Sequence, residues 1–214
     1  AGEQGKTECW YVIAAEPGAE IIYGHNAKTK EEFEKLASSG EWDKLLHSIP
    51  VKAGDFYYVP SGTVHAIGAG IVILETQQSS DTTYRLYDYD RVEEATGKTR
   101  PLQITESLDV TTVPHHVEEM PMKKVISENM SMITLVESPY FNVFKWEVRG
   151  AATMNATGPY TLISVISGTG HIRIDDDSYD LKAGDHLVLP TDVTTWKLKG
   201  NMEIIASTPG EKNS

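Results

Sequence analysis

The sequence predicts an all-β protein built from two tandem β-barrels of jelly-roll type, with a helical insertion in the first barrel. Three observations support this prediction. Short strand-like runs separated by turn signals recur along much of the chain, which is typical of sandwiches and barrels. A long β segment near residue 50 is repeated near the C-terminus, and one stretch with helical periodicity interrupts the first copy.

The repeat is clearest when VKAGDFYYVPSGTVHAI, which starts at Val51, is aligned with LKAGDHLVLPTDVTTWK, which starts at Leu181. The Lys-Ala-Gly-Asp segments then match at an offset of 130 residues (182 minus 52), and Pro60 matches Pro190. A repeat unit well above 40 residues indicates duplicated domains rather than a solenoid. We therefore expect two copies of one β unit.

The upstream part of the alignment locates the insertion. Aligning Gly18 with Gly170 gives an offset of 152, which is 22 residues more than the downstream offset (152 minus 130). That difference is about the length of residues 29–49, the one clear helical stretch. Thr29 and Glu32 at its start fit a capping box, so we expect a helix over this stretch.

The remaining elements follow in order. Residues 8–14 and 19–23 are strand-like and are separated by a Glu-Pro-Gly turn signal. A polar connector with a short helix at 102–110 follows the first repeat, and short strand-like runs resume from Ile133. The expected domains are a first barrel at 1–92 with the insertion 29–49, a connector at 93–130, and a second barrel at 131–214.

Composition excludes several classes of protein. The 214 residues carry a net charge of −12, which argues against nonspecific binding to nucleic acid or anionic membranes. Cys9 is the only cysteine, so no intrachain disulfide can form and a reducing cytoplasm is the default. No apolar run is long enough for a transmembrane helix. We expect a cytoplasmic monomer or weak homo-oligomer.

The stretch from Val51 to Asp90 contains candidate site residues. His65 ends a Pro-Ser-Gly loop, Glu75 ends an apolar strand, and Arg85 lies in an aromatic run. An imidazole, a carboxylate and a guanidinium on neighbouring elements indicate a small-molecule site. A partly buried Glu75 would suit proton transfer, and the alternative is that it only pairs with Arg85.

Glu8 is a further candidate, because it shares a strand face with Trp10 and Val12. The alternative is a frayed strand end in solvent. In the repeat alignment His65 matches Thr195 and Glu8 matches Tyr160, so the second copy lacks both residues. Their joint absence favours metal binding by the first copy.

The pattern G-D-x-x-x-x-P-x-x-x-x-H, from Gly54 to His65, resembles the second motif of the cupin family, whose β jelly roll binds a metal inside the barrel. The longer run PSGTVHAIGAGIVILETQQSSDTTYRLYDYDR, together with GKTECWYV, is similar to the short bacterial form of the type I mannose-6-phosphate isomerase family. The resemblance covers essentially the whole chain.

The resemblance implies a zinc-dependent aldose–ketose isomerase that interconverts mannose 6-phosphate and fructose 6-phosphate through an enediol. It implies that Glu8 and His65 bind the zinc ion, and that Arg85, Glu75 and Lys6 are active-site residues. Arg85 would bind an anion, either the enediolate or the phosphate. Lys6 would bind phosphate or steer proton transfer, and the alternative is a frayed terminal lysine.

One departure from the family changes the expectation for this chain. The family's Gln-x-His zinc motif should precede GKTE, but only AGEQ stands there. We therefore expect a chain that lacks the N-terminal part of the family, holds zinc weakly or not at all, and has little isomerase activity. The competing hypotheses are a non-catalytic sugar-binding or regulatory bicupin and, ranked last, a metal-dependent oxygenase of the cupin class.

Overall fold

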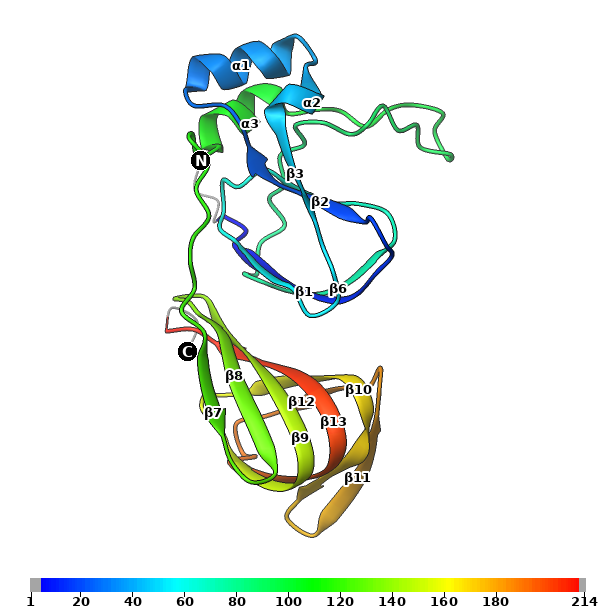
Figure 1. Ribbon diagram of the computed structural model, residues 1–214, viewed down its shortest axis with the longest axis vertical. Coiled ribbons are helices and arrows are strands. Elements are labelled where there is room, and N and C mark those ends of the chain that lie inside the picture. Colours follow the sequence, from blue (N-terminus) through cyan, green and yellow to red (C-terminus); the bar gives the residue numbers. More distant parts are fainter. Residues whose placement is uncertain (1–4, 212–214) are drawn as a thin grey trace. The chain divides into compact units, whose positions relative to one another are not determined.

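The computed structural model describes residues 5–211, and the chain folds into two compact units, Ala1–Glu118 and Glu119–Ser214 (Figure 1). In both units the regular secondary structure is mainly antiparallel strand, so the prediction of a β-rich chain is confirmed. The expected connector at 93–130 is divided between the two units. Among the described residues, no helix is both long enough and apolar enough to cross a membrane.

The first unit contains two three-stranded antiparallel sheets. The first has the order β4-β1-β6, from Phe56–Val59, Glu8–Ala15 and Ile71–Gln77, and the second has the order β3-β2-β5, from Leu46–Pro50, Glu20–His25 and His65–Ile67. Apolar side chains of these strands and of the adjoining turns pack into one buried cluster. The members of this cluster are Trp10, Val12, Ala19, Ile21, Tyr23, Val51 and Val59.

The helices of the first unit pack on a separate apolar cluster. Helix α1 (Lys30–Ser38) supplies Phe33 and Ala37, α2 (Trp42–Leu45) supplies Leu45, and α3 (Ile104–Val110) packs against them (Figure 1). The predicted cap is present, because Thr29 Oγ1 accepts a hydrogen bond from the backbone of Glu32 at 3.2 Å.

The expectation of helix throughout 29–49 was wrong in its second half. Gly40 ends the first helical segment with φ of 69°, and helix α2 ends at Leu45. Residues Leu46–Pro50 form strand β3, which pairs with β2. The pairing partner Ile21 is distant in sequence, so tertiary pairing overrode the local helical pattern here.

The second unit is a seven-stranded antiparallel sheet with the order β11-β10-β13-β9-β8-β7, in which β12 also pairs with β10. Its core is formed by buried side chains such as Trp146, Trp196 and Ile204. Three of its strands are long, with 14 or 15 residues each, where the sequence predicted short runs, and Lys123–Ile126, predicted as connector, forms a strand. The seven strands are β7 (Lys123–Ile126), β8 (Met130–Glu137), β9 (Phe141–Asn155), β10 (Thr161–Ile174), β11 (Asp177–Lys182), β12 (His186–Leu189) and β13 (Thr195–Pro209).

The repeated Gly-Asp segments form the same turn in both units. Gly54 and Gly184 have φ of 89° and 91°, a conformation that favours glycine. In the first unit Gly54 N donates to Val12 O at 2.8 Å, and in the second Gly184 N donates to Val165 O at 2.9 Å. The two copies therefore share this turn and its strand contact, as the alignment predicts.

The turn contacts correct one part of the sequence alignment. Val12 corresponds to Val165, an offset of 153 (165 minus 12), so Glu8 corresponds to Thr161 and not to Tyr160. The strand pairs agree, because Glu8 lies opposite Val59 and Thr161 lies opposite Leu189. Thr161 carries no carboxylate, so the contrast between the two copies remains.

Candidate functional site

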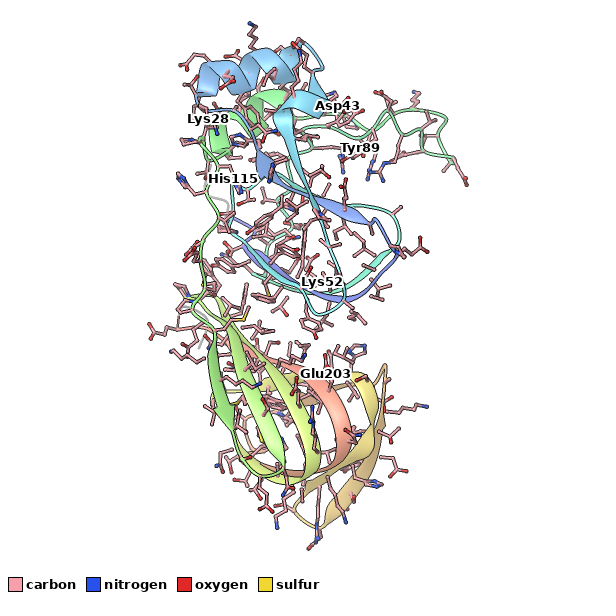
Figure 2. All side chains as sticks on the ribbon, viewed as in Figure 1. Lys28, Asp43, Lys52, Tyr89, His115 and Glu203 are labelled. Atoms are coloured by element: carbon pink, nitrogen blue, oxygen red, sulfur yellow. The ribbon has the colours of Figure 1, made fainter. Side chains whose placement is uncertain are left out.

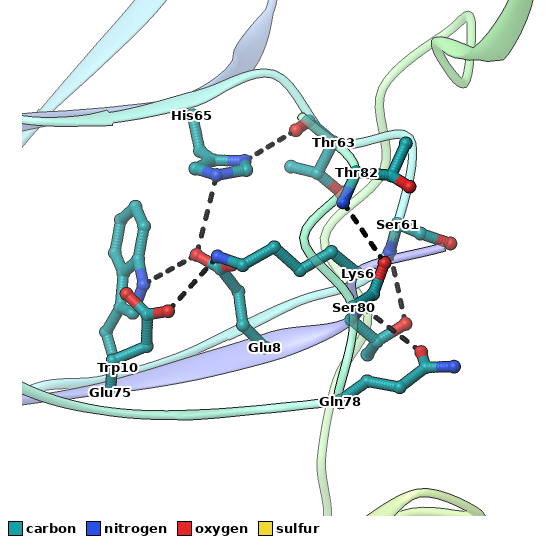
Figure 3. A network of polar contacts seen from close by, with 11 residues as sticks. Lys6, Glu8, Trp10, Ser61, Thr63, His65, Glu75, Gln78, Ser80 and Thr82 are labelled. Carbon is teal, nitrogen blue, oxygen red and sulfur yellow. Dashed lines mark hydrogen bonds and ion pairs between the residues drawn. The ribbon is translucent and has the colours of Figure 1, made fainter. Parts of the chain in front are cut away.

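Glu8 lies at the start of β1, the central strand of its sheet, where β4 and β6 flank it. Only 1% of its surface is exposed, so the alternative of a frayed strand end in solvent is wrong. Glu8 Oε1 accepts a hydrogen bond from Trp10 Nε1 at 2.9 Å, and Glu8 Oε2 accepts one from Lys6 Nζ (Figure 3). The buried carboxylate is therefore held at both oxygens.

His65 lies at the start of β5 and brings its imidazole to the same carboxylate (Figure 3). His65 Nε2 is 3.4 Å from Glu8 Oε1. Its Nδ1 is 2.8 Å from the carbonyl oxygen of Thr63. A carbonyl oxygen can only accept, so Nδ1 carries a proton and Nε2 is the nitrogen directed at Glu8.

This geometry fits two ligands of one zinc ion. With zinc–ligand bonds of about 2.0–2.2 Å in a tetrahedron, two ligand atoms lie about 3.3–3.6 Å apart, and Glu8 Oε1 and His65 Nε2 are 3.4 Å apart. Metal-binding histidines commonly donate their other ring N–H to a carbonyl or carboxylate, as His65 does to Thr63. Among residues 5–211, no group of three or more His, Cys, Asp or Glu side chains gathers around one point.

Lys6 joins Glu8 to Glu75. Its Nζ contacts Glu8 Oε2 and lies 3.1 Å from Glu75 Oε1 (Figure 3). Burial alone would lower the pKa of Lys6, but the hydrogen bonds and charges of the two carboxylates together raise it above its usual value. Lys6 is therefore an ammonium ion at neutral pH and can donate hydrogen bonds or a proton.

The contacts of Glu75 rule out the alternative that it only pairs with Arg85. Glu75 lies on β6 opposite Trp10 in the sheet, and its ionic partner is Lys6. Within the described part of the chain, no ion pair joins Glu75 to Arg85. The alternative of a simple Glu75–Arg85 pair is thus replaced by a Lys6-centred network.

A cavity of about 670 Å³ contains Arg85 in its wall together with Lys6 and His65. Eight consecutive residues, Thr82–Tyr89, line it, although they belong to no strand or helix. A loop before His65 and the end of α3 complete the wall. The candidate residues Lys6, His65 and Arg85 thus line one cavity. Glu8 contacts both Lys6 and His65, and Glu75 contacts Lys6, so each carboxylate touches a residue of the cavity wall.

Sequence reasoning assigned no role to several residues that hold this site. Alternation along the strand placed Trp10 on the same face as Glu8, but the hydrogen bond that Trp10 donates to Glu8 was not foreseen. Thr63 acts through its backbone carbonyl, so its side-chain type gives no signal. The contact of Arg85 with Gln103 joins residues 18 apart across irregular chain, where no periodicity applies.

Comparisons with known proteins agree with the fold and the motifs. Residues 131–209 match the family model "Mannose-6-phosphate isomerase, cupin domain". The chain is 53% identical over 210 residues to the mannose-6-phosphate isomerase of Streptococcus mutans, covering 98% of this chain and 66% of that protein. It is 52% identical over 206 residues to mannose-6-phosphate isomerase ManA of Bacillus subtilis, covering 96% and 65%.

Solved structures share the fold of this chain. A crystal structure of the mannose 6-phosphate isomerase from Bacillus subtilis matches with a TM-score of 0.92 and 43% identity, over 96% of this chain and 65% of that one. A mannose 6-phosphate isomerase bound with zinc and yttrium shares the fold, with a TM-score of 0.74 at 12% identity. The chain spans about 65% of the length of these relatives.

Proposed function

The chain belongs to the mannose-6-phosphate isomerase family, and we propose that its first unit carries residues with which such an enzyme interconverts mannose 6-phosphate and fructose 6-phosphate. The observation that supports this most is the convergence of Lys6, His65 and Arg85 on one cavity. Its volume of about 670 Å³ is in the range usual for small-molecule sites. Arg85 in the wall of this cavity supplies a cation that an anionic sugar phosphate could bind, whereas the charge of Lys6 is already paired with Glu8 and Glu75.

We propose that Glu8 and His65 are zinc ligands. The 3.4 Å spacing and the proton on His65 Nδ1 support this assignment. A proton-free Nε2 and a carboxylate oxygen would repel each other at that distance unless a cation or a proton lay between them. When bound, zinc would polarise the sugar carbonyl or order its hydroxyl groups.

The proposed roles of the other residues follow from their charges. Isomerisation moves a proton between C1 and C2 through an enediol, and negative charge develops on oxygen during that transfer. Arg85 would stabilise the enediolate or bind the phosphate with its guanidinium. Glu75 would accept or return the carbon-bound proton, and the Lys6 ammonium would donate hydrogen bonds beside it.

We also propose that both units are cupin barrels, the second without a metal. The shared Gly-Asp turn supports a common origin for the two units. Thr161 and Thr195 take the places of Glu8 and His65 in the second unit, so that unit lacks the proposed ligand pair. Its core would then not depend on metal binding.

The test is an isomerase assay that couples formation of fructose 6-phosphate to NADPH production. It should be run on the 214-residue chain and on the protein encoded by the full reading frame that contains it. Zinc-dependent turnover of mannose 6-phosphate supports the proposal. Sugar-phosphate binding in calorimetry without turnover, in both proteins, would favour the non-catalytic sugar-binding alternative.

A further inference from the structure

We infer that Gln103 is a positioning residue for Arg85. The inference rests on the proposed function, because it takes its significance from the proposed role of the Arg85 guanidinium. Arg85 lies in the irregular cavity wall, so no neighbouring strand holds its backbone. A catalytic group must be held within a fraction of an ångström of its productive position, and this wall needs another means of support.

Gln103 supplies that support at both backbone polar groups of Arg85. Arg85 N donates to Gln103 Oε1 at 2.8 Å, and Gln103 N donates to Arg85 O at 2.8 Å. Gln103 Nε2 donates to the carbonyl oxygen of Pro101 at 3.4 Å, which fixes the orientation of the amide. Arg85 Nη1 reaches the same Pro101 oxygen at 3.5 Å.

Helix capping does not account for a glutamine here. Gln103 is the N-cap residue of α3, yet its side chain makes no capping hydrogen bond to the helix. Serine, threonine, aspartate and asparagine are the preferred residues at this position. The glutamine side chain thus binds Arg85 and does not cap the helix, although it stands at the N-cap position.

The residues after Arg85 are anchored independently of Gln103. Leu86 is buried in the cluster formed with the helices. Tyr87 stacks on Trp42, with ring centroids 4.5 Å apart and planes inclined by 12°. Asp88 Oδ2 accepts a hydrogen bond from Arg100 Nε at 2.8 Å, and the second carboxylate oxygen contacts the same guanidinium. Loss of the Gln103 side chain should therefore loosen Arg85 and leave the rest of the wall in place.

The variant Gln103→Asn separates the two roles. Asparagine is a good N-cap residue, but its side chain is one methylene shorter and does not reach the Arg85 amide. In the protein encoded by the full reading frame, we expect turnover to fall about tenfold because misplacement of a catalytic group lowers the rate steeply. Zinc content and thermal stability should stay at the parent level.

A double-mutant cycle with Arg85→Ala distinguishes positioning from a general structural effect. If Gln103 acts through Arg85, Gln103→Asn should lower turnover in the parent and have no further effect in the Arg85→Ala variant. Equal effects in both backgrounds, or no effect in the parent, would overturn the inference. If Arg85→Ala alone leaves turnover unchanged, it is the proposed function of Arg85 that fails.

Amide hydrogen exchange tests the inference without any enzyme activity. In the 214-residue chain, Gln103→Asn should speed exchange of the Arg85 amide at least about tenfold, because this amide loses its acceptor. Exchange at amides of the β1–β6 pair should not change. Unaltered protection of Arg85 would show that Gln103 does not hold it.

Discussion

His65 Nε2 lies 3.4 Å from Glu8 Oε1, and this contact joins the two sheets of the first unit. Glu8 belongs to the β4-β1-β6 sheet and His65 to the β3-β2-β5 sheet. The Trp10 ring meets the His65 ring edge to face at 5.4 Å and also donates to Glu8. The proposed zinc pair is therefore assembled by packing between sheets, and its geometry depends on the fold of the whole first unit.

The first prediction concerns zinc. His65→Ala removes one of two proposed ligands, so zinc affinity of the 214-residue chain should fall at least about tenfold, as is usual even for loss of indirect support at metal sites. Titration calorimetry with zinc and elemental analysis of the purified chain measure this. The parent itself should bind weakly, because zinc sites normally have three or four protein ligands.

His186→Ala is the matched control for the zinc measurement. His186 is an exposed histidine of the second unit whose Nδ1 contacts Ser164 Oγ at 2.8 Å. Its removal should leave zinc affinity unchanged. Equal losses in His65→Ala and His186→Ala, or none in either, would contradict the assignment of His65.

The second prediction concerns Arg85. Arg85→Ala should lower turnover of the protein encoded by the full reading frame about 10²–10³-fold, the usual loss when one charge-stabilising donor is removed. Zinc content should remain, because Arg85 is assigned to charge stabilisation and not to metal binding. Arg173→Ala, at an exposed arginine of the second unit that donates to Asp175 O, should have full activity. Release of zinc by Arg85→Ala would refute the assigned role.

The sequence was sufficient for those parts of the fold that depend on local chemistry. The Gly-Asp turns need a positive φ at Gly54 and Gly184, and glycine marks such positions in sequence. The cap at Thr29 is equally local. By contrast, strand β3 forms because Leu46–Pro50 pairs with β2, a non-local contact that no periodicity within 29–49 reveals.

In the candidate site too, the features that depend on local sequence were predictable and those that depend on non-local contacts were not. Alternation along β1 placed Glu8 and Trp10 together before the structure did, and the repeat singled out His65. Gln103 could not be found this way, because its contact with Arg85 bridges irregular chain. The Lys6–Glu75 pair joins residues 69 apart, and it depends on the pairing of β1 with β6, which the sequence did not specify.

The third prediction is a loss of stability in acid. His25 is buried and His115 is packed near it, with ring centroids 6.1 Å apart (Figure 2 labels His115). Burial lowers the pKa of His25, with a further contribution from Lys28. Burial also lowers the pKa of His115, and the charges of His25, His47 and His116 add to that effect.

Proton linkage gives the direction in which the free energy of unfolding changes with pH. Because both pKa values are lower in the folded chain than the ordinary value of about 6.5, the unfolded chain binds more protons below that pH. The free energy of unfolding should be fully maintained above about pH 6.5 and should fall as the pH is lowered further. Urea unfolding of the chain between pH 8 and pH 5 measures this dependence.

Variants identify the histidines responsible. His115→Gln should reduce the acid-dependent part of the loss, because one titrating group is removed. His171→Gln should not, because His171 is exposed and its Nδ1 contacts Asp180 at 2.8 Å. If both variants keep the parent's pH dependence, His115 does not contribute to it.

The fourth prediction uses two glycines with similar backbone conformations. Gly24 and Gly18 have φ of 86° and 81°, so alanine at either position should cost about 1–2 kcal/mol from the left-handed backbone alone. A Cβ atom on Gly18 would meet nothing within 4 Å, whereas one on Gly24 would lie 2.1 Å from Cδ2 of His115. Gly24→Ala should therefore cost an additional 1–3 kcal/mol, roughly the cost of overpacking a buried site. Urea unfolding at pH 8 gives both values, and the difference between them isolates the contact with His115.

The double variant Gly24→Ala with His115→Ala should recover most of this difference, since the smaller side chain leaves room for the new Cβ. Equal destabilisation by Gly18→Ala and Gly24→Ala would show that His115 does not lie close to Gly24 in solution.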